Sequence, residues 1–177
     1  MREMVLGQDA NFTMDSFIKR YNSDLANDFG NLLNRISTLI HKNYDGIIPQ
    51  SRELTLDEKI LKDSAGKLVG EMDEKIKNMK INEAIEDIMQ FIRRINKYME
   101  EQAPWKLVKE NKDAAGRILY AAGESLRISA SLLSPVMPNR ISILLEALNT
   151  VESTEWGGLK SGSKIRAHQP LFPRIQV

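Results

Sequence analysis

Two short polar segments contain residue types that could read an unpaired nucleic-acid base. In the first, Asn31 and Arg35 are four residues apart, so on a helix they share one face. An amide beside a guanidinium offers both donors and acceptors to the Watson–Crick edge of a base. A structural role is also open, because polar pairs at this spacing are common on solvated helix faces. Arg35 could pair with Asp28 or another carboxylate, with Asn31 merely solvated.

The second segment, residues 96–107, contains a tryptophan beside cations. Pro104 disfavours helix at Ala103 and leaves Trp105 at the start of a new turn, next to Lys106. An accessible tryptophan can stack on a base and contribute about 1–3 kcal/mol per base. The alternative is a half-buried tryptophan that closes the end of a helical bundle. The residues alone leave both interpretations open.

Helical periodicity dominates the rest of the chain. Apolar residues recur every three or four positions in four long stretches, which begin at Ile18, Leu61, Ile81 and Ile118. A shorter helix is expected to begin at residue 138 or 139 and to end near residue 148. Helix boundaries are indicated by N-cap, capping-box and proline signals at Thr13, Thr55 with Glu58, Pro104 and Pro135.

These stretches predict an all-α fold, an up-and-down bundle of about five helices with an irregular C-terminal tail. We assign residues 13–150 to the bundle and residues 151–177, which are rich in glycine and proline, to the tail. Residues 1–12 precede the bundle. Trp156 is expected to hold the tail against the bundle.

Composition excludes several classes of function. The 25 Lys and Arg nearly cancel the 24 Asp and Glu, so nucleic-acid binding must be local rather than driven by bulk charge. The absence of cysteine excludes a thiolate zinc site and a cysteine nucleophile. With two histidines and neither a Gly-rich phosphate loop nor a His-Glu-x-x-His motif, we expect no catalytic constellation, metal or cofactor. No apolar run is long enough to span a membrane, so we expect a cytoplasmic protein.

Both polar segments resemble signature stretches of bacterial-type methionyl-tRNA synthetases. Residues 25–35, Leu-Ala-Asn-Asp-Phe-Gly-Asn-Leu-Leu-Asn-Arg, resemble the first helix of the family's anticodon-binding domain. Residues 96–107 resemble its Glu-Gln-Ala-Pro-Trp segment. Weaker matches follow the family's order at residues 7–12, 135–138 and 171–175. The first of them implies that residues 1–12 are the link from the family's catalytic domain. The resemblance therefore covers essentially the whole chain.

The resemblance implies that Asn31 and Arg35 hydrogen-bond the first anticodon base, a cytidine, and that Trp105 stacks on an anticodon base. Polar neighbours of these three residues are possible supporting residues, namely Asn27, Asn34, Asn96 and Tyr98. The implied partners are methionine tRNA with the anticodon CAU and the catalytic domain of the same enzyme. Neither DNA nor a membrane is an expected partner.

The chain also departs from the family. It lacks the ATP-binding segments of the His-Ile-Gly-His and Lys-Met-Ser-Lys-Ser types, and residues 139–141 differ from the usual continuation. We therefore expect the anticodon-binding portion of an ATP- and Mg-dependent methionine–tRNA ligase, inactive by itself. One alternative is the corresponding domain of a leucine, isoleucine, valine or cysteine enzyme. Another is a helical protein-interaction scaffold, which predicts a buried Trp105 and an Asn31/Arg35 face that is blocked or paired.

Overall fold

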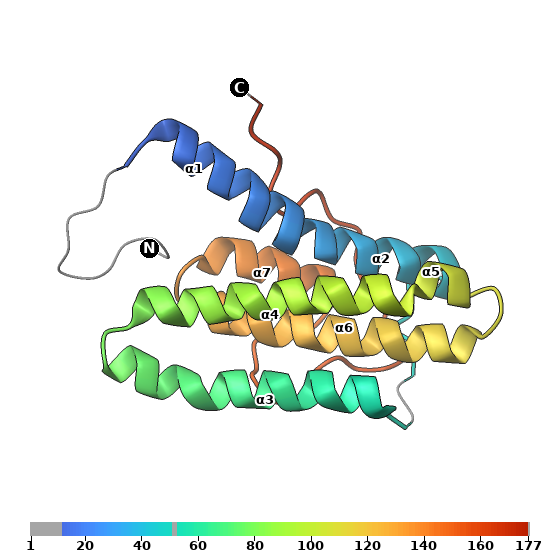
Figure 1. Ribbon diagram of the computed structural model, residues 1–177. Coiled ribbons are helices and arrows are strands. Elements are labelled where there is room, and N and C mark those ends of the chain that lie inside the picture. Colours follow the sequence, from blue (N-terminus) through green and yellow to red (C-terminus); the bar gives the residue numbers. More distant parts are fainter. Residues whose placement is uncertain (1–11, 51–52, 177) are drawn as a thin grey trace.

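The protein folds as a bundle of helices, which confirms the all-α prediction (Figure 1). The computed structural model describes residues 12–50 and 53–176, and within these ranges it contains five long helices, one short helix and no strand longer than an isolated bridge. Of the predicted link, only Phe12 belongs to these ranges. The weak resemblance at residues 7–12 lies outside them, again with the exception of Phe12.

The first long helix changes its winding near its middle. It consists of α1 (Met14–Arg20), the π-helical segment η1 (Tyr21–Gly30) and α2 (Asn31–Tyr44). The Thr13 hydroxyl accepts a hydrogen bond from the amide of Ser16 at 3.2 Å, so the predicted N-cap is present. π-Helical segments are rare and often occur at functional sites. Here the segment ends at Gly30, directly before Asn31.

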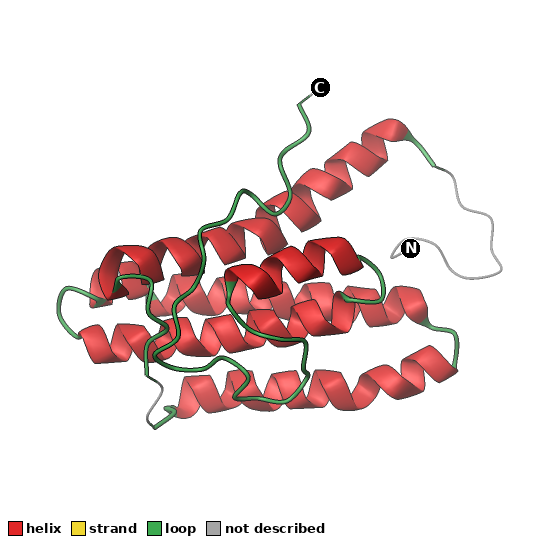
Figure 2. Cartoon of the chain, turned by 180° about the vertical axis from the view of Figure 1, so that it is seen from behind, coloured by secondary structure: helices red, strands yellow, loops and turns green. Residues whose placement is uncertain are grey.

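Three further helices of 22 residues lie side by side with alternating direction. They are α3 (Leu56–Lys77), α4 (Ile81–Gln102) and α6 (Lys112–Leu133). A single turn, α5 (Pro104–Leu107), joins α4 to α6, while α7 (Pro138–Ala147) packs on α6 at the rear of the bundle (Figure 2). The up-and-down arrangement follows from the short connections.

Local sequence signals explain where α3 begins and where α4 ends. The Glu58 carboxylate accepts a hydrogen bond from the Thr55 amide at 2.6 Å, which completes the predicted capping box of α3. At the end of α4, Ala103 takes a left-handed conformation with φ 41°. The residue before a proline is disfavoured in the right-handed helical region, so Pro104 stops α4 and redirects the chain into α5.

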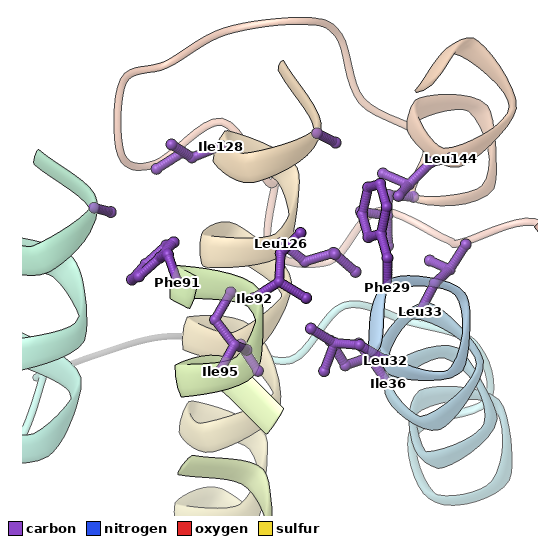
Figure 3. Close-up of a cluster of buried hydrophobic side chains, with 14 of the residues drawn as sticks. Phe29, Leu32, Leu33, Ile36, Phe91, Ile92, Ile95, Leu126, Ile128 and Leu144 are labelled. Atoms are coloured by element: carbon purple, nitrogen blue, oxygen red, sulfur yellow. The ribbon is translucent and has the colours of Figure 1, made fainter. Parts of the chain in front are cut away.

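The core is formed by the apolar stripes that the spacing predicted. Side chains from η1, α2, α4, α6 and α7 meet in one cluster (Figure 3). Fully or almost fully buried members of this cluster are Phe29, Leu32, Ile36, Ile92, Ile95, Leu126 and Leu144. This packing holds α2 against the bundle, so that its opposite face is left for other contacts.

A buried ion pair fastens the start of the tail to α6. Glu124 and Arg127 are completely buried, and their side chains are 2.6 Å apart. Arg127 also donates to the carbonyl oxygen of Ser153 at 2.6 Å and to that of Glu155. Glu124 accepts a hydrogen bond from the amide of Leu159. Both charged side chains thus form hydrogen bonds with backbone groups of the tail. The ion pair therefore stabilises the tail only in this position.

The end of the tail packs against the first helix. The Phe172 ring lies 5.7 Å from that of Phe29, measured between centroids. The Asn22 side chain exchanges two hydrogen bonds with the backbone of Ile175, at 2.9 and 3.0 Å. Trp156 is half-buried against the core, as expected of a residue that holds the tail. The tail is thus irregular in shape but ordered by specific contacts.

Two features are absent from the described ranges. None of their helices is both long and apolar enough to cross a membrane. Nor do these residues contain a group of three or more His, Cys, Asp or Glu side chains that could hold a metal ion.

Two glycine substitutions should have opposite effects on stability. A Cβ atom added to Gly158 would lie 2.5 Å from Cζ of Arg127, whose hydrogen bonds leave it no room to move. We expect Gly158→Ala to cost about 1–3 kcal/mol, as overpacking does. Gly66, inside α3, has no atom within 4 Å of the added Cβ. Gly66→Ala should therefore stabilise the helix by about 0.5–1 kcal/mol. Urea unfolding measures both, and equal effects would contradict the packing around Arg127.

Tyrosine ionisation should reveal the same packing. Burial, assisted by Asp113, raises the pKa of Tyr44 from 10.0 to about 12, and burial with Glu124 does the same for Tyr120. Because the pKa values are raised in the folded state, the contribution of these two tyrosines to stability is fully present below pH 10. It is lost as the pH rises through about 12. Phenolate absorbance should therefore appear at a higher pH in the folded chain than in the chain unfolded in urea. Identical titrations of both states would contradict this, and Tyr44→Phe is the control that removes one delayed group.

Candidate nucleic-acid interface

Arg35 and Trp105 meet on the surface although they are far apart in the sequence. The Arg35 guanidinium carbon lies 5.4 Å from the centroid of the Trp105 ring, which is cation–π distance. Trp105 keeps 38% of its surface exposed. Proteins that bind single-stranded nucleic acids stack the bases on solvent-exposed aromatic side chains that lie close to cations. Trp105 beside Arg35 has this arrangement.

Two helices hold this pair in place. Arg35 belongs to α2, whose neighbouring residues Leu32 and Ile36 are completely buried and fix the rotation of the helix. Asn31 is one turn before Arg35 and is exposed. Trp105 is the second residue of α5, so its position depends on the break that Pro104 makes after α4.

Around the pair lies an open pocket of about 290 Å³. Its lining comes from α2 and α5 and consists of Asn31, Asn34, Arg35, Thr38, Leu39 and Trp105. The structure thus brings together all three predicted contact residues and the predicted neighbour Asn34. Thr38 and Leu39 were not predicted, although the spacing of three and four residues from Arg35 would have identified them.

Asn96, another predicted neighbour, joins α4 to the pocket. Its amide nitrogen donates to the carbonyl oxygen of Asp28 at 2.9 Å, which turns its oxygen toward Arg35. Arg35 donates to that oxygen at 3.4 Å, and the exposed Glu100 carboxylate lies 3.7 Å from the same guanidinium nitrogen. Charge-assisted contacts are normally 2.7–2.9 Å long, so Arg35 is held loosely and can exchange partners.

Two predicted neighbours do not line the pocket. Asn27 is exposed on η1, before the π-helical winding ends. Tyr98 is buried and donates to the Glu58 carboxylate at 3.2 Å; burial and the Glu58 charge raise its pKa well above the usual value. Residues two positions apart on a helix point about 200° away from each other, so Tyr98 lies on the opposite side of α4 from Asn96. Its position therefore does not fit a supporting role at Trp105.

The scaffold alternative also made a structural prediction. It required Trp105 to be buried and the Asn31/Arg35 face to be blocked or paired. Trp105 is exposed instead. Arg35 is paired with Asn96 and Glu100, but at 3.4 and 3.7 Å, and Asn31 and Arg35 line an open pocket. The geometry therefore favours binding of a planar ligand over a closed structural contact.

Comparison with known families agrees with the resemblance. Residues 48–175 match the family model described as the anticodon binding domain of methionyl tRNA ligase. The chain belongs to the methionyl-tRNA ligase family. Residues 1–37 match a second model, described as class I tRNA synthetases (M). The family that the two polar segments indicated is thereby confirmed, and a leucine, isoleucine, valine or cysteine enzyme is not favoured.

Individual relatives extend over the whole chain. It is 38% identical to a methionine–tRNA ligase of Caldanaerobacter subterraneus subsp. tengcongensis and 40% identical to one of Clostridium acetobutylicum, with 100% of this chain aligned to each. The chain spans 29% of the length of these curated relatives. A crystal structure of apo Mycobacterium tuberculosis methionyl-tRNA synthetase is similar, with a TM-score of 0.93 at 30% identity. That similarity covers 99% of this chain and 37% of the other, which confirms the fold.

Asn96 should contribute measurably to stability, because its side chain joins α4 to η1 and α2. Asn96→Ala removes its hydrogen bond to the Asp28 carbonyl and its contact with Arg35. We expect a loss of about 1 kcal/mol in the free energy of unfolding, typical of such hydrogen bonds. Asn82→Ala is the matched control on the same helix, since no side-chain hydrogen bond of Asn82 is found within the described ranges. Equal unfolding midpoints for the two variants would contradict this role.

Proposed function

We propose that this chain recognises the CAU anticodon of methionine tRNA, as the anticodon-binding portion of a methionine–tRNA ligase. In this proposal Asn31 and Arg35 hydrogen-bond the first anticodon base, a cytidine, and Trp105 stacks on an anticodon base. The observation that carries it is the Arg35 guanidinium over an exposed Trp105, beside Asn31, in one open pocket.

Hydrogen-bond chemistry supports a preference for cytidine. Cytosine has acceptors at O2 and N3 and a donor at N4. The Arg35 guanidinium can donate to the acceptors, and the Asn31 carbonyl can accept from the N4 amino group. Uracil has a donor at N3 and an acceptor at O4, so it leaves polar groups of the pocket unpaired. Each unpaired buried group costs about 1–3 kcal/mol, enough to discriminate between the two bases.

The loose contacts of Arg35 support its participation in binding. Its hydrogen bond to Asn96 is 3.4 Å long and its distance to Glu100 is 3.7 Å. A base that offers acceptors at shorter range can replace these partners. The exposed part of the Trp105 ring provides the stacking surface, worth about 1–3 kcal/mol per base.

The proposed partners also include the catalytic domain of the same enzyme. α1 contains no buried residue, and Phe12 and Phe17 expose 68% and 46% of their surface. The match to the class I synthetase family covers residues 1–37, which include α1. This apolar face supports docking of the catalytic domain, which would use ATP and Mg to attach methionine. We propose that this reaction takes place in the cytoplasm.

A binding titration with two anticodon stem-loops tests the proposal. The chain should bind a stem-loop carrying CAU more tightly than one carrying UAU at the same salt concentration. Arg35→Ala should abolish most of this preference because it removes the donors to cytosine. Trp105→Ala should weaken binding roughly 5- to 150-fold, which corresponds to the loss of one stacked base.

Two controls make the result specific. Arg140→Ala removes the same charge from an exposed position on α7 and should leave both affinities unchanged. Trp105→Phe keeps an aromatic surface and should retain part of the affinity. Equal binding of CAU and UAU by the unmodified chain would refute anticodon reading. Unaltered binding by both alanine variants, with circular dichroism showing intact helices, would refute the site.

A further inference from the structure

The end of α2 and the start of α6 lie at the same end of the bundle (Figure 1). Residues from both line a second pocket. Its volume is about 480 Å³. Its polar lining is provided by Tyr44 at the end of α2, by Gln50 after α2, and by Lys112, Asp113 and Arg117 on α6. The anticodon site proposed above uses none of these residues.

Arg117 contributes a hydrogen-bond donor that has no acceptor. Its Nε atom is buried and has no hydrogen-bond partner. No ion pair or hydrogen bond joins its guanidinium to the part of the chain that the structure describes, including Asp113, which is one turn away on the same helix. A buried donor without an acceptor costs about 1–3 kcal/mol, so an anion that accepts from this group would be favoured.

Lys112 adds a second cation with a defined position. Its ammonium lies over the ring of Tyr44, 5.1 Å from the centroid. The Tyr44 hydroxyl donates to the carbonyl oxygen of Lys112 at 2.6 Å, which fixes the ring beneath the ammonium. Lys112 has no carboxylate partner among the described residues. Two cations therefore face the single carboxylate of Asp113 in this pocket.

The pocket is linked structurally to the Trp105 site. α2 contributes Thr38 and Leu39 to the first pocket and ends at Tyr44 in the second. Trp105 precedes Lys112 by only seven positions, and the connection between them is closed by a hydrogen bond from the Asn111 amide to the Leu107 carbonyl at 2.7 Å. α5 and the start of α6 lie at the same end of the bundle (Figure 1), so an extended polyanion bound on α5 can continue toward α6.

We infer that this second pocket binds a backbone phosphate of the RNA whose anticodon contacts Trp105, with Arg117 and Lys112 as the ligating residues. The inference rests on the proposed function. The net charge of the chain is only +1, so bulk attraction cannot hold RNA and phosphate contacts must be local. Such contacts position a nucleic acid without reading its sequence.

The test uses the 177-residue chain and the CAU and UAU stem-loops, titrated between about 50 and 200 mM salt. Arg117→Met and Lys112→Ala should each weaken binding of both stem-loops by the same factor, roughly tenfold at the lower salt concentration. Each should also reduce the slope of log affinity against log salt by about 0.7–0.9, as the loss of one phosphate contact does. The ratio of CAU to UAU affinity should stay unchanged.

Matched controls separate this site from general charge effects. Arg94→Ala and Lys62→Ala remove exposed cations from α4 and α3 and should change neither affinity nor slope. In the absence of RNA, Arg117→Met should be at least as stable as the unmodified chain, because it removes the unpaired buried Nε–H. This result would show that weaker binding does not reflect unfolding.

Three outcomes would overturn the inference. In one, the Arg117 and Lys112 variants retain the affinity and salt slope of the unmodified chain. In another, they change only the CAU preference. In the third, inorganic phosphate binds through Arg117 while RNA binding is unaffected, which would identify a free anion as the ligand. A chain that binds both stem-loops equally, but with a salt slope that depends on Arg117, would refute anticodon reading and retain the phosphate site.

Discussion

The buried ion pair between Glu124 and Arg127 is the interaction on which the shape of this molecule depends. Two complete charges in an apolar core are tolerated only if every donor and acceptor finds a partner. Here those partners are backbone groups of Ser153, Glu155 and Leu159, so α6 and the start of the tail must fold together. α6 in turn packs against α2, α3, α4, α5 and α7, which transmits this constraint to the whole bundle.

The second constraint is the break between α4 and α5. Pro104 ends α4, and Ala103 before it takes a left-handed conformation. The chain then turns so that Trp105 reaches the exposed face of α2 instead of continuing along α4. A rigid bundle thus presents an aromatic ring beside a guanidinium whose own contacts are long. Rigid placement of the elements and loose partners for Arg35 together suit a surface that binds a ligand.

Electrostatics in this protein is a local matter. The chain has almost no net charge, and many of its cations pair with carboxylates on the same or a neighbouring helix, such as Lys75 with Asp87. Arg117 and Lys112 have no carboxylate partner in the described ranges and, unlike exposed cations such as Lys62 and Arg140, they line a pocket. Arg35 has one long contact to Glu100 and lines the other pocket. The contacts with a polyanion proposed here therefore lie in two pockets and not across a broad basic face.

The sequence by itself determined the helices, since periodic apolar stripes, the Thr13 cap, the Thr55–Glu58 capping box and Pro104 act through neighbouring residues. It also indicated the family and the three residues now found around one pocket. It did not determine which side of a helix each residue occupies, as for Tyr98, which lies on the opposite side of α4 from Asn96. Only the tertiary structure decided that Trp105 is exposed, that Glu124 and Arg127 are buried, and that Arg117 lacks an acceptor. These properties arise from contacts between segments far apart in the chain, which no local pattern encodes.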